Sequence, residues 1–444
     1  MSNEARTFQA KLKNLFASLK QSLFLKNILI VMSGTAIAQI IAYALYPIIS
    51  RLFTPQDFGI FGSFSAVVGI IASLITLDYS QALMLPKEKS DAINLFCLSI
   101  ISAIFITLIV SIFSIIKPSV FYNLTKTRGV WLLILFILTI FISGINYASQ
   151  AWAVRSKAFK LTSASQVIRS IGSSGSRIIF GAFKAGSFGL IISNIIAELG
   201  ASINLIRVVI PDLMSLKNKI NLSRIKSLAK EYIDFPLYSA SQNFINAISS
   251  GLPVLLLTKF YGLTVAGAYA FGVSILQAPM GLVLTALRQV LFQRACEYQN
   301  EGKGIYLLYI RTVLILFAMA IIPSLILIIW APQIFAFIFG ARWHLAGVLA
   351  RSLIIWLAVV FCNLPAVIFA RIIRIQRFVF FYDLVLLALR TATLVLGGMY
   401  LKVTHTVMVF AIVGAAMNIF LIYYVGRKVA KREGKTNLLS FKNM

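Results

Sequence analysis

Roughly a dozen apolar runs of about 20 residues fill most of this chain, and a helix of that length crosses the hydrocarbon core of a bilayer. Hydrophobic residues make up 59% of the sequence and charged residues 12%, so a water-soluble domain would have no place to bury its apolar surface. We therefore expect an all-α integral membrane protein with about 12 transmembrane helices. The runs lie near residues 28–50, 58–80, 92–116, 130–154, 161–183, 186–206, 235–258, 265–292, 305–330, 345–370, 378–401 and 403–426.

The longest hydrophilic stretch between runs separates six of them from the other six, which predicts two six-helix lobes. Before the first run, apolar side chains recur at helical spacing with lysines between them, which is typical of an amphipathic helix on a membrane surface. Pro332 is expected to end the ninth helix before an interfacial piece that reaches Phe339. The predicted organisation is an amphipathic basic segment (1–27), an N-lobe (28–210), a cytoplasmic connector (211–234), a C-lobe (235–426) and a basic cytoplasmic tail (427–444).

The charge is strongly positive, with 41 Lys and Arg against 13 Asp and Glu. The basic residues fall in short segments between the apolar runs, where they would meet lipid headgroups, so we expect membrane lipids and no nucleic acid among the partners. Counted by alternate sides, 28 lie on the side that holds both termini, 8 on the other side and 5 inside the runs. The positive-inside rule therefore predicts that both termini are cytoplasmic.

A weak internal repeat relates the two halves at an offset of 208 residues. It aligns Arg51 with Lys259, Gly59 with Gly267, Phe61 with Tyr269 and Gln81 with Gln289. An even number of spans gives both halves the same orientation. The repeat is therefore expected to be parallel, about an axis along the membrane normal.

Five arginines lie inside the predicted spans, where each costs about 2.5 to 3.5 kcal/mol on insertion scales. They are Arg169, Arg177, Arg288, Arg351 and Arg390. Charges at this depth mark functional sites by default, and the sign of this set predicts an anionic cargo. A guanidinium forms bidentate, charge-assisted bonds to phosphate, and such bonds are strongest in a low-dielectric site.

Several of these charges also have a structural interpretation. Arg169 and Glu198 lie at similar depth on neighbouring antiparallel spans, which favours an ion pair, with a proton- or substrate-coupled role as the alternative. Arg177 has no acid at its depth, and is therefore the better cargo ligand of the two arginines in its span. Arg390 lies near the middle of the bilayer.

Arg390, Asp383 and Arg351 form either a network inside the second lobe or part of a cargo site. Arg288 and Asp78 lie near cytoplasmic span ends, where snorkelling explains them. Arg51, at the outer end of the first span, is an anchor, a gate contact or a late phosphate contact. The carboxyl groups that are candidates for coupling to a proton or a sodium ion are Glu198, Asp78 and Asp383, and we expect no metal site or organic cofactor.

Two helices carry polar side chains at steps of three and four residues. The first span has Thr35, Gln39, Tyr43, Tyr46 and Ser50, and the seventh has Ser239, Gln242, Asn246 and Ser249. Because these are the opening helices of the two halves, we favour the polar wall of a cavity. Hydrogen bonding between packed helices is the alternative.

Four segments, in their order and spacing, resemble a known family. They are RLFTPQDFGIF (51–61), ALMLPKEKSDAINL (82–95), WAVRSKAFK (152–160) and DFPLYSASQNFINAISSGLPVLLLTKFYGLTVAGAYAFG (234–272). The resemblance runs across nearly the whole chain. It is to the polysaccharide-biosynthesis branch of the multidrug, oligosaccharidyl-lipid and polysaccharide exporter superfamily, which includes the Wzx-type flippases for O-antigen and capsule repeat units.

The resemblance implies a V-shaped pair of six-helix lobes around a central cavity that opens alternately to the cytoplasm and to the outside. The implied cargo is an undecaprenyl-diphosphate-linked oligosaccharide of lipopolysaccharide or capsule biosynthesis in the bacterial inner membrane, with polysaccharide polymerase machinery as a further partner. The candidate cargo residues are then Arg177, Arg51, Arg390, Arg351, Arg169 and Arg288, with Gln39, Tyr43, Gln242 and Asn246 in a polar wall for the sugars.

Two other function classes fit the sequence less well. A cation-coupled multidrug exporter of the same superfamily would need acids in the cavity, especially in the first helix, and residues 27–50 contain none. A membrane glycosyltransferase, polymerase or ligase would need a catalytic motif. His344 and His405 are far apart, however, and no paired-carboxylate motif is present. We therefore expect a transporter and not an enzyme.

The charge asymmetry predicts the outcome of a labelling experiment. Single cysteines at Asn123 and Asn218, in a background lacking Cys97, Cys296 and Cys362, should differ in their reaction with an impermeant thiol reagent in intact cells. The cysteine at 123 should react and the cysteine at 218 should not. The reverse pattern would overturn the predicted orientation.

Overall fold

The computed structural model describes residues 23–127, 129–300 and 304–442, and these form helices without strands. The N-lobe contains α2 (Leu23–Leu52), α3 (Pro55–Ala72), α5 (Lys89–Ile116), α7 (Val130–Arg155), α8 (Phe159–Ala182) and α9 (Gly186–Ser215). The C-lobe contains α11 (Ser241–Tyr261), α12 (Leu263–Asn300), α13 (Tyr306–Phe339), α14 (His344–Cys362), α16 (Gln376–Tyr400) and α17 (Val403–Lys442). The shorter helices include α4 (Tyr79–Ala82), α6 (Pro118–Thr125), α10 (Leu222–Glu231) and α15 (Leu364–Ile372).

Ten helices in the described ranges are long and apolar enough to cross a membrane. The long helices α2 and α8 complete the predicted set of twelve. Helix α8 is the least apolar of them because it carries Arg169, Arg177 and several serines. The predicted amphipathic helix at the start of the chain lies almost wholly outside the described residues.

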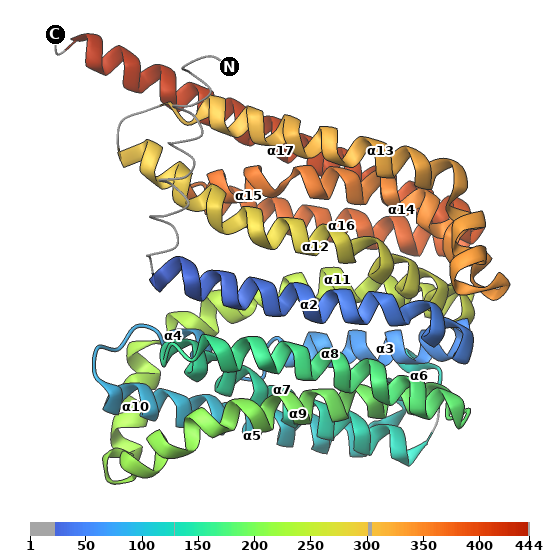
Figure 1. Ribbon diagram of the computed structural model, residues 1–444, viewed down its shortest axis with the longest axis horizontal. Coiled ribbons are helices and arrows are strands. Elements are labelled where there is room, and N and C mark those ends of the chain that lie inside the picture. Colours follow the sequence, from blue (N-terminus) through green and yellow to red (C-terminus); the bar gives the residue numbers. More distant parts are fainter. Residues whose placement is uncertain (1–22, 128, 301–303, 443–444) are drawn as a thin grey trace, which may run out of the picture.

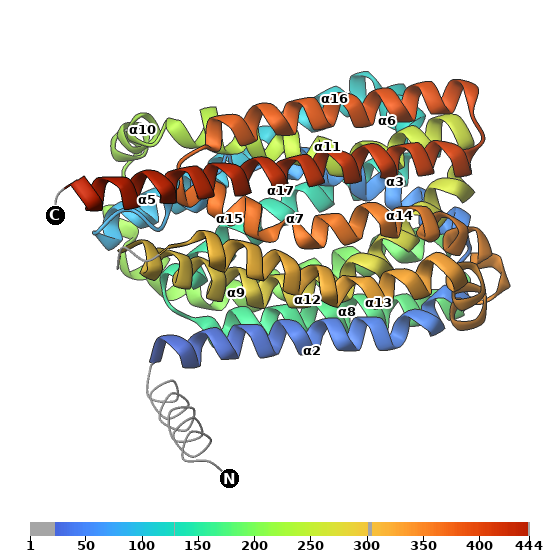
Figure 2. The ribbon, with the colours of Figure 1, turned by 90° about the horizontal axis from the view of Figure 1, so that it is seen from above.

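The two lobes lie side by side, with all their long helices roughly parallel to the long axis of the molecule (Figures 1 and 2). Helix α10, part of the connector, marks one end, which we call the α10 end. Helix α17 ends there and α2 begins there (Figure 1). Because each lobe has an even number of long helices, both lobes begin and end at the same end of the molecule.

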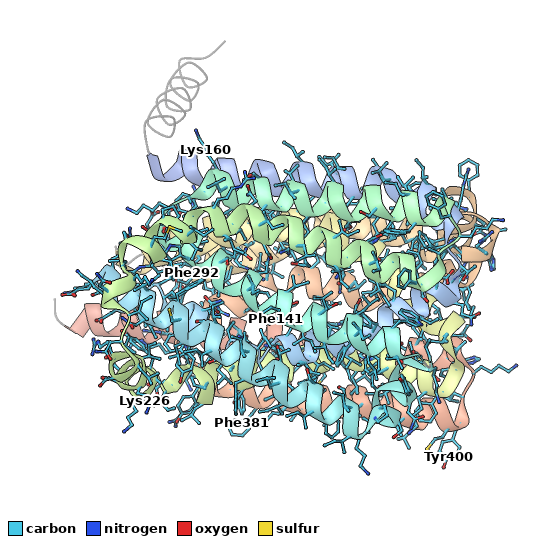
Figure 3. The ribbon with its side chains drawn as sticks, turned by 90° about the horizontal axis from the view of Figure 1, so that it is seen from below. Phe141, Lys160, Lys226, Phe292, Phe381 and Tyr400 are labelled. Atoms are coloured by element: carbon cyan, nitrogen blue, oxygen red, sulfur yellow. The ribbon has the colours of Figure 1, made fainter. Side chains whose placement is uncertain are left out.

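The flanks of the helices are covered by apolar side chains. Large apolar residues such as Ile115, Ile322 and Phe337 are exposed, as they are along most of α13. Figure 3 shows Lys160 and Lys226 near the α10 end and Phe141 and Phe381 along the helices between the ends. Apolar flanks of this extent are stable in contact with lipid and not with water, so the chain is a multi-pass membrane protein.

Polar contacts tie the connector to the N-lobe at the α10 end. Arg224 of α10 makes a bidentate ion pair with Asp91 at the start of α5, with distances of 2.8 and 2.6 Å. Arg155, at the end of α7, donates to the carbonyl oxygens of Leu83 and Pro86. Arg155 therefore holds together two of the segments on which the family resemblance rests, and Asp91 joins one of them to the connector.

At the opposite end, contacts between buried groups join the two lobes. Ser50 Oγ of α2 donates to the carbonyl oxygen of Phe339 at 3.0 Å, and Trp343 Nε1 donates to the carbonyl oxygen of Ser50 at 2.8 Å. The Trp343 ring also stacks on Phe271 with ring centroids 4.0 Å apart and meets the edge of Phe58 at 5.2 Å. The lobes are therefore closed against each other at this end.

Helices α3 and α12 cross at two glycines that the sequence repeat aligns with each other. A Cβ atom at Gly59 would overlap the backbone carbonyl of Leu263, and one at Gly267 would overlap the carbonyl of Pro55 and lie 2.5 Å from the backbone nitrogen of Gly59. Glycine allows this approach because it has no side chain to separate the helices. Next to the crossing, the hydroxyls of Ser63 and Thr258 lie 2.7 Å apart, hydrogen-bonded and buried.

The predicted break at Pro332 is wrong, because α13 continues through Pro332 to Phe339. Arg351 of α14 donates to the carbonyl oxygen of Ile329 at 2.9 Å, in the helical turn before the proline. Pro332 lacks the N–H that would bond the carbonyl oxygen of Ile328, and a neighbouring helix supplies a hydrogen bond to the adjacent carbonyl, which is one way in which membrane helices tolerate proline.

Substituting Gly267 should open the joined end. In Gly267→Ala the new methyl group would meet backbone atoms that cannot move without separating α3 from α12. Spin labels at Phe183 and Tyr400, exposed residues at this end of the two lobes, should report a longer distance in the variant. Gly281→Ala is the matched control on α12, since nothing lies within 4 Å of that position. Equal distances in the two variants would contradict this account of the closed end.

Candidate functional site

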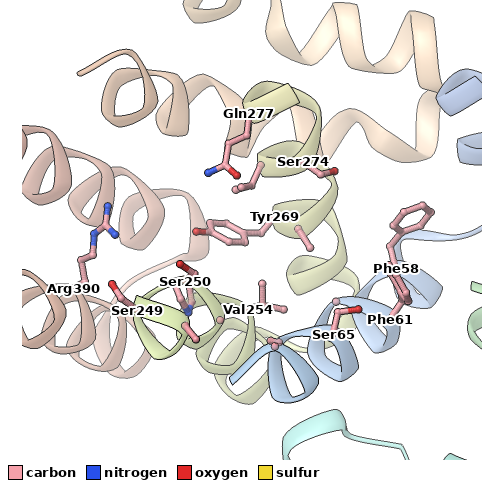
Figure 4. Close-up of a pocket in the computed structure, with 18 of the residues that line it drawn as sticks. Phe58, Phe61, Ser65, Ser249, Ser250, Val254, Tyr269, Ser274, Gln277 and Arg390 are labelled. Carbon is pink, nitrogen blue, oxygen red and sulfur yellow. The ribbon is translucent and has the colours of Figure 1, made fainter. Parts of the chain in front are cut away.

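A cavity of about 540 Å³ lies between the two lobes. Its wall is formed by α2 and α3 of the N-lobe and by α11, α12, α14 and α16 of the C-lobe. In Figure 4 Arg390 lies at one side of the cavity and Phe58 and Phe61 at the other, with Tyr269 between them. The polar lining residues are Tyr46, Ser65, Ser249, Ser250, Tyr269, Ser274, Gln277, Trp356 and Arg390.

Arg390 is the charged residue among the described residues that line this cavity. The residue is 8% exposed, and its Cζ atom lies 4.2 Å from the ring centroid of Trp356 and 5.2 Å from that of Phe410. Its Nε atom is buried without a hydrogen-bond partner. The rings offer a cation–π contact, which leaves most of the guanidinium donors free for a ligand.

The predicted network of Arg390, Asp383 and Arg351 does not form. No ion pair involves any of the three within the described ranges. Arg351 instead donates a hydrogen bond to the backbone of α13. Asp383 lies on the same helix as Arg390, two helical turns away. Aromatic rings from α14 and α17 contact the Arg390 guanidinium instead, which leaves the cargo-site alternative for this residue.

Arg177 is buried in the N-lobe, with 8% of the residue exposed. Its Cζ atom lies 5.2 Å from the centroid of the Phe61 ring, and its Nε atom has no hydrogen-bond partner. As predicted from its depth, it pairs with no acid of the described residues. Phe61 lines the cavity, whereas Arg177 does not.

The predicted pair of Arg169 and Glu198 is confirmed. Arg169 Nη2 lies 3.0 Å from Glu198 Oε2 and donates to Asn146 Oδ1 at 2.8 Å. Asn146 in turn donates to Ser202 Oγ at 2.9 Å. This chain of polar groups joins α7, α8 and α9 inside the N-lobe, away from the residues that line the central cavity.

The remaining predicted arginines lie outside the cavity. Arg51 is exposed in the last turn of α2, at the end where the lobes are joined. Arg288 is exposed on α12 beyond the lining residues, toward the α10 end. Neither makes an ion pair with the described residues.

Some side chains of the two polar stripes line the cavity, and others form contacts between packed helices. Tyr46 and Ser249 line the cavity, and Tyr43 stacks on Tyr46 with ring centroids 5.7 Å apart. Ser50 serves packing through its bond to Phe339. Gln39 has a buried Oε1 atom without a hydrogen-bond partner. Gln242 and Asn246 are exposed on α11. The side chain of Thr35 lies outside the described part of the structure.

Asp78 lies in a second cavity of about 490 Å³, together with Tyr147 and Asn243. Its Oδ2 atom accepts a hydrogen bond of 3.3 Å from Asn243 Nδ2, so this contact connects the N-lobe to the start of α11. Asp78 is buried and accepts a hydrogen bond from the other lobe. It therefore does not snorkel toward the membrane surface, contrary to what the sequence suggests. The coupling role of Asp78, Glu198 and Asp383 stays a prediction.

Sequence reasoning missed most of the wall that α12 and α14 supply. Tyr269, Ser274 and Gln277 follow one face of α12 toward the cavity, and Trp356 joins them from α14. One signal was available, because the repeat aligns Tyr269 with Phe61 and both line the cavity.

The comparison with protein families gives one match. Residues 48–347 match the family model described as "Polysaccharide biosynthesis protein". No curated protein sequence matches the chain.

Solved structures of several membrane proteins share the fold. One is a multidrug resistance MATE family transporter of the MOP superfamily in an inward-facing conformation, with a TM-score of 0.67 and 15% identity over 90% of this chain and 96% of that chain. Another is the lipid II flippase MurJ in an inward closed conformation, with a TM-score of 0.67 and 14% identity over 92% and 93%. A third is a MOP superfamily transporter from Pyrococcus furiosus, described as having a binding pocket of reverse polarity, with a TM-score of 0.61 and 14% identity over 91% and 96%.

Proposed function

Because the chain belongs to the family of polysaccharide biosynthesis proteins, we propose that it is a flippase for lipid-linked oligosaccharides. Its cargo is an undecaprenyl-diphosphate-linked repeat unit of O-antigen or another surface polysaccharide. The protein moves this cargo from the inner to the outer leaflet of the bacterial cytoplasmic membrane, where polymerase machinery receives it. It acts by alternating access and not by catalysis.

The observation that carries this proposal is the charge of the central cavity. Arg390 faces the cavity, and the described lining residues include no carboxylate. A diphosphate would supply the acceptors that the free guanidinium donors lack, and a site shielded from water strengthens such charge-assisted bonds. The hydroxyl and amide groups of Tyr269, Ser249 and Gln277 offer hydrogen bonds to sugar hydroxyls.

The closed end of the molecule supports a direction for transport. With both termini in the cytoplasm, as the charge asymmetry predicts, the joined end faces the outside and the α10 end faces the cytoplasm. The structure then corresponds to a state that receives cargo from the cytoplasmic side. The fold shared with the lipid II flippase MurJ supports a cargo that keeps a lipid anchor in the bilayer.

A multidrug exporter is the main competing function, because the fold is also that of a MATE family transporter. Export of a cationic drug would favour carboxylates in the cavity. The cavity of this protein instead presents a guanidinium, which repels a cation and attracts an anion.

Substituting Arg390 tests the proposal. Arg390→Gln should reduce surface polysaccharide at least about tenfold at normal membrane abundance, because a hydrogen bond to a charged group contributes about 1.5 to 3 kcal/mol. Arg390→Lys should restore part of the activity, since a point charge cannot reproduce the guanidinium fork. Both quantities are measured in cells that depend on this protein for their polysaccharide.

Arg427→Gln is the matched control. Arg427 also lies over an aromatic ring, that of Tyr423 at 5.7 Å, but it is exposed on α17 and does not line the cavity. Cells that carry Arg427→Gln should make a normal amount of surface polysaccharide. Full polysaccharide from Arg390→Gln at normal abundance would contradict the proposal, and so would a loss of activity that only follows a loss of protein.

A further inference from the structure

Arg177 and Arg390 lie on corresponding helices of the two lobes, although not at the same position along them. Helices α8 and α16 are each the fifth long helix of their lobe. Arg177 lies over Phe61 of α3, and Arg390 shares the cavity wall with Tyr269 of α12, the residue that the repeat aligns with Phe61. Each arginine residue is 8% exposed, has its guanidinium over at least one aromatic ring and has a buried Nε atom without a partner. The protein thus holds two similar cationic positions, one in each lobe.

The two positions differ in access to the cavity. Arg390 lines it. Arg177 does not line it and is buried, with its guanidinium over the ring of Phe61, which does line it. A cation–π contact is weaker than a bidentate bond to phosphate, so the ring masks the Arg177 charge without competing strongly against a phosphate ligand. Arg177 is therefore a covered site in this state of the molecule.

Phe61 lies where the two lobes are joined. Two residues before it, Gly59 touches the backbone of Leu263, and two residues after it, Ser63 is hydrogen-bonded to Thr258. Any separation of the lobes at this end must break both contacts, and it must therefore move the segment of α3 that carries Phe61 relative to α11 and α12. The cover over Arg177 is thus tied to the closure between the lobes.

We propose that Arg177 is a second phosphate-binding position, which Phe61 covers while the lobes are joined and exposes when they separate. The phosphate groups of the cargo bind first at Arg390 of the C-lobe and pass to Arg177 of the N-lobe as the joined end opens. This inference rests on the proposed function, because it assumes an anionic cargo in the same cavity. It adds an order of binding and a role for Phe61.

The test separates binding from transport. Inorganic diphosphate is titrated into purified Arg390→Gln, Arg177→Gln and unchanged protein, and surface polysaccharide and membrane abundance are measured in cells. Diphosphate affinity should fall about tenfold in Arg390→Gln and hardly change in Arg177→Gln, whose site is covered. Polysaccharide should fall in both variants at normal abundance, with partial recovery in Arg177→Lys.

A cysteine variant tests the cover itself. In a background lacking the native cysteines, Arg177→Cys should react slowly with an anionic thiol reagent. It should react faster when combined with Phe61→Ala or with Gly267→Ala, which opens the joined end. Arg390→Cys should react readily in all three backgrounds, because position 390 already lines the cavity.

Three outcomes would overturn the inference and leave the proposed function standing. One is normal polysaccharide from Arg177→Gln, and another is a loss of polysaccharide that only follows reduced abundance. The third is an equal loss of diphosphate affinity in the two Gln variants, which would indicate a single site. Failure of the proposed function looks different, because Arg390→Gln would then keep both its diphosphate affinity and its polysaccharide.

Discussion

A guanidinium buried without a carboxylate is costly inside a membrane protein, and the described part of the chain holds two such groups, one in each lobe. Arg177 and Arg390 are stabilised by aromatic rings and not by acids. Ring contacts offset part of the desolvation cost and leave the charge available. Arg169 shows the other solution, since Glu198 neutralises it within the N-lobe. The cavity between the lobes is therefore suited to an anion because the paired charges lie elsewhere.

Close packing of the two lobes at one end of the molecule determines where this cavity lies. Gly59 and Gly267 allow α3 and α12 to meet backbone to backbone, and the Trp343 indole reaches across to the carbonyl of Ser50. The same two helices line the cavity beyond the crossing. A movement that separates the lobes must therefore also reshape the site. This coupling is what a transporter that changes its access from one side to the other requires.

The sequence predicts the architecture well because bilayer length and charge asymmetry are strong constraints. The two six-helix lobes and the Arg169–Glu198 pair follow from run lengths and from depth along each helix. The partners of Arg390 could not be predicted in this way, since Trp356 and Phe410 come from other helices and apolar runs contain many aromatic residues. The prediction that a helix ends at Pro332 was wrong for a similar reason, because the hydrogen bond from Arg351 to α13 depends on tertiary packing.

Transport of an anionic, lipid-linked sugar is the central claim for this protein, and a reconstituted system measures such transport directly. The purified protein is placed in liposomes that contain an undecaprenyl-diphosphate-linked oligosaccharide in both leaflets, and an impermeant glycosidase is added outside. Protein-free liposomes should keep the inner-leaflet oligosaccharide protected, and proteoliposomes should lose that protection. If the protected fraction remained the same with and without the protein, the central claim would be contradicted.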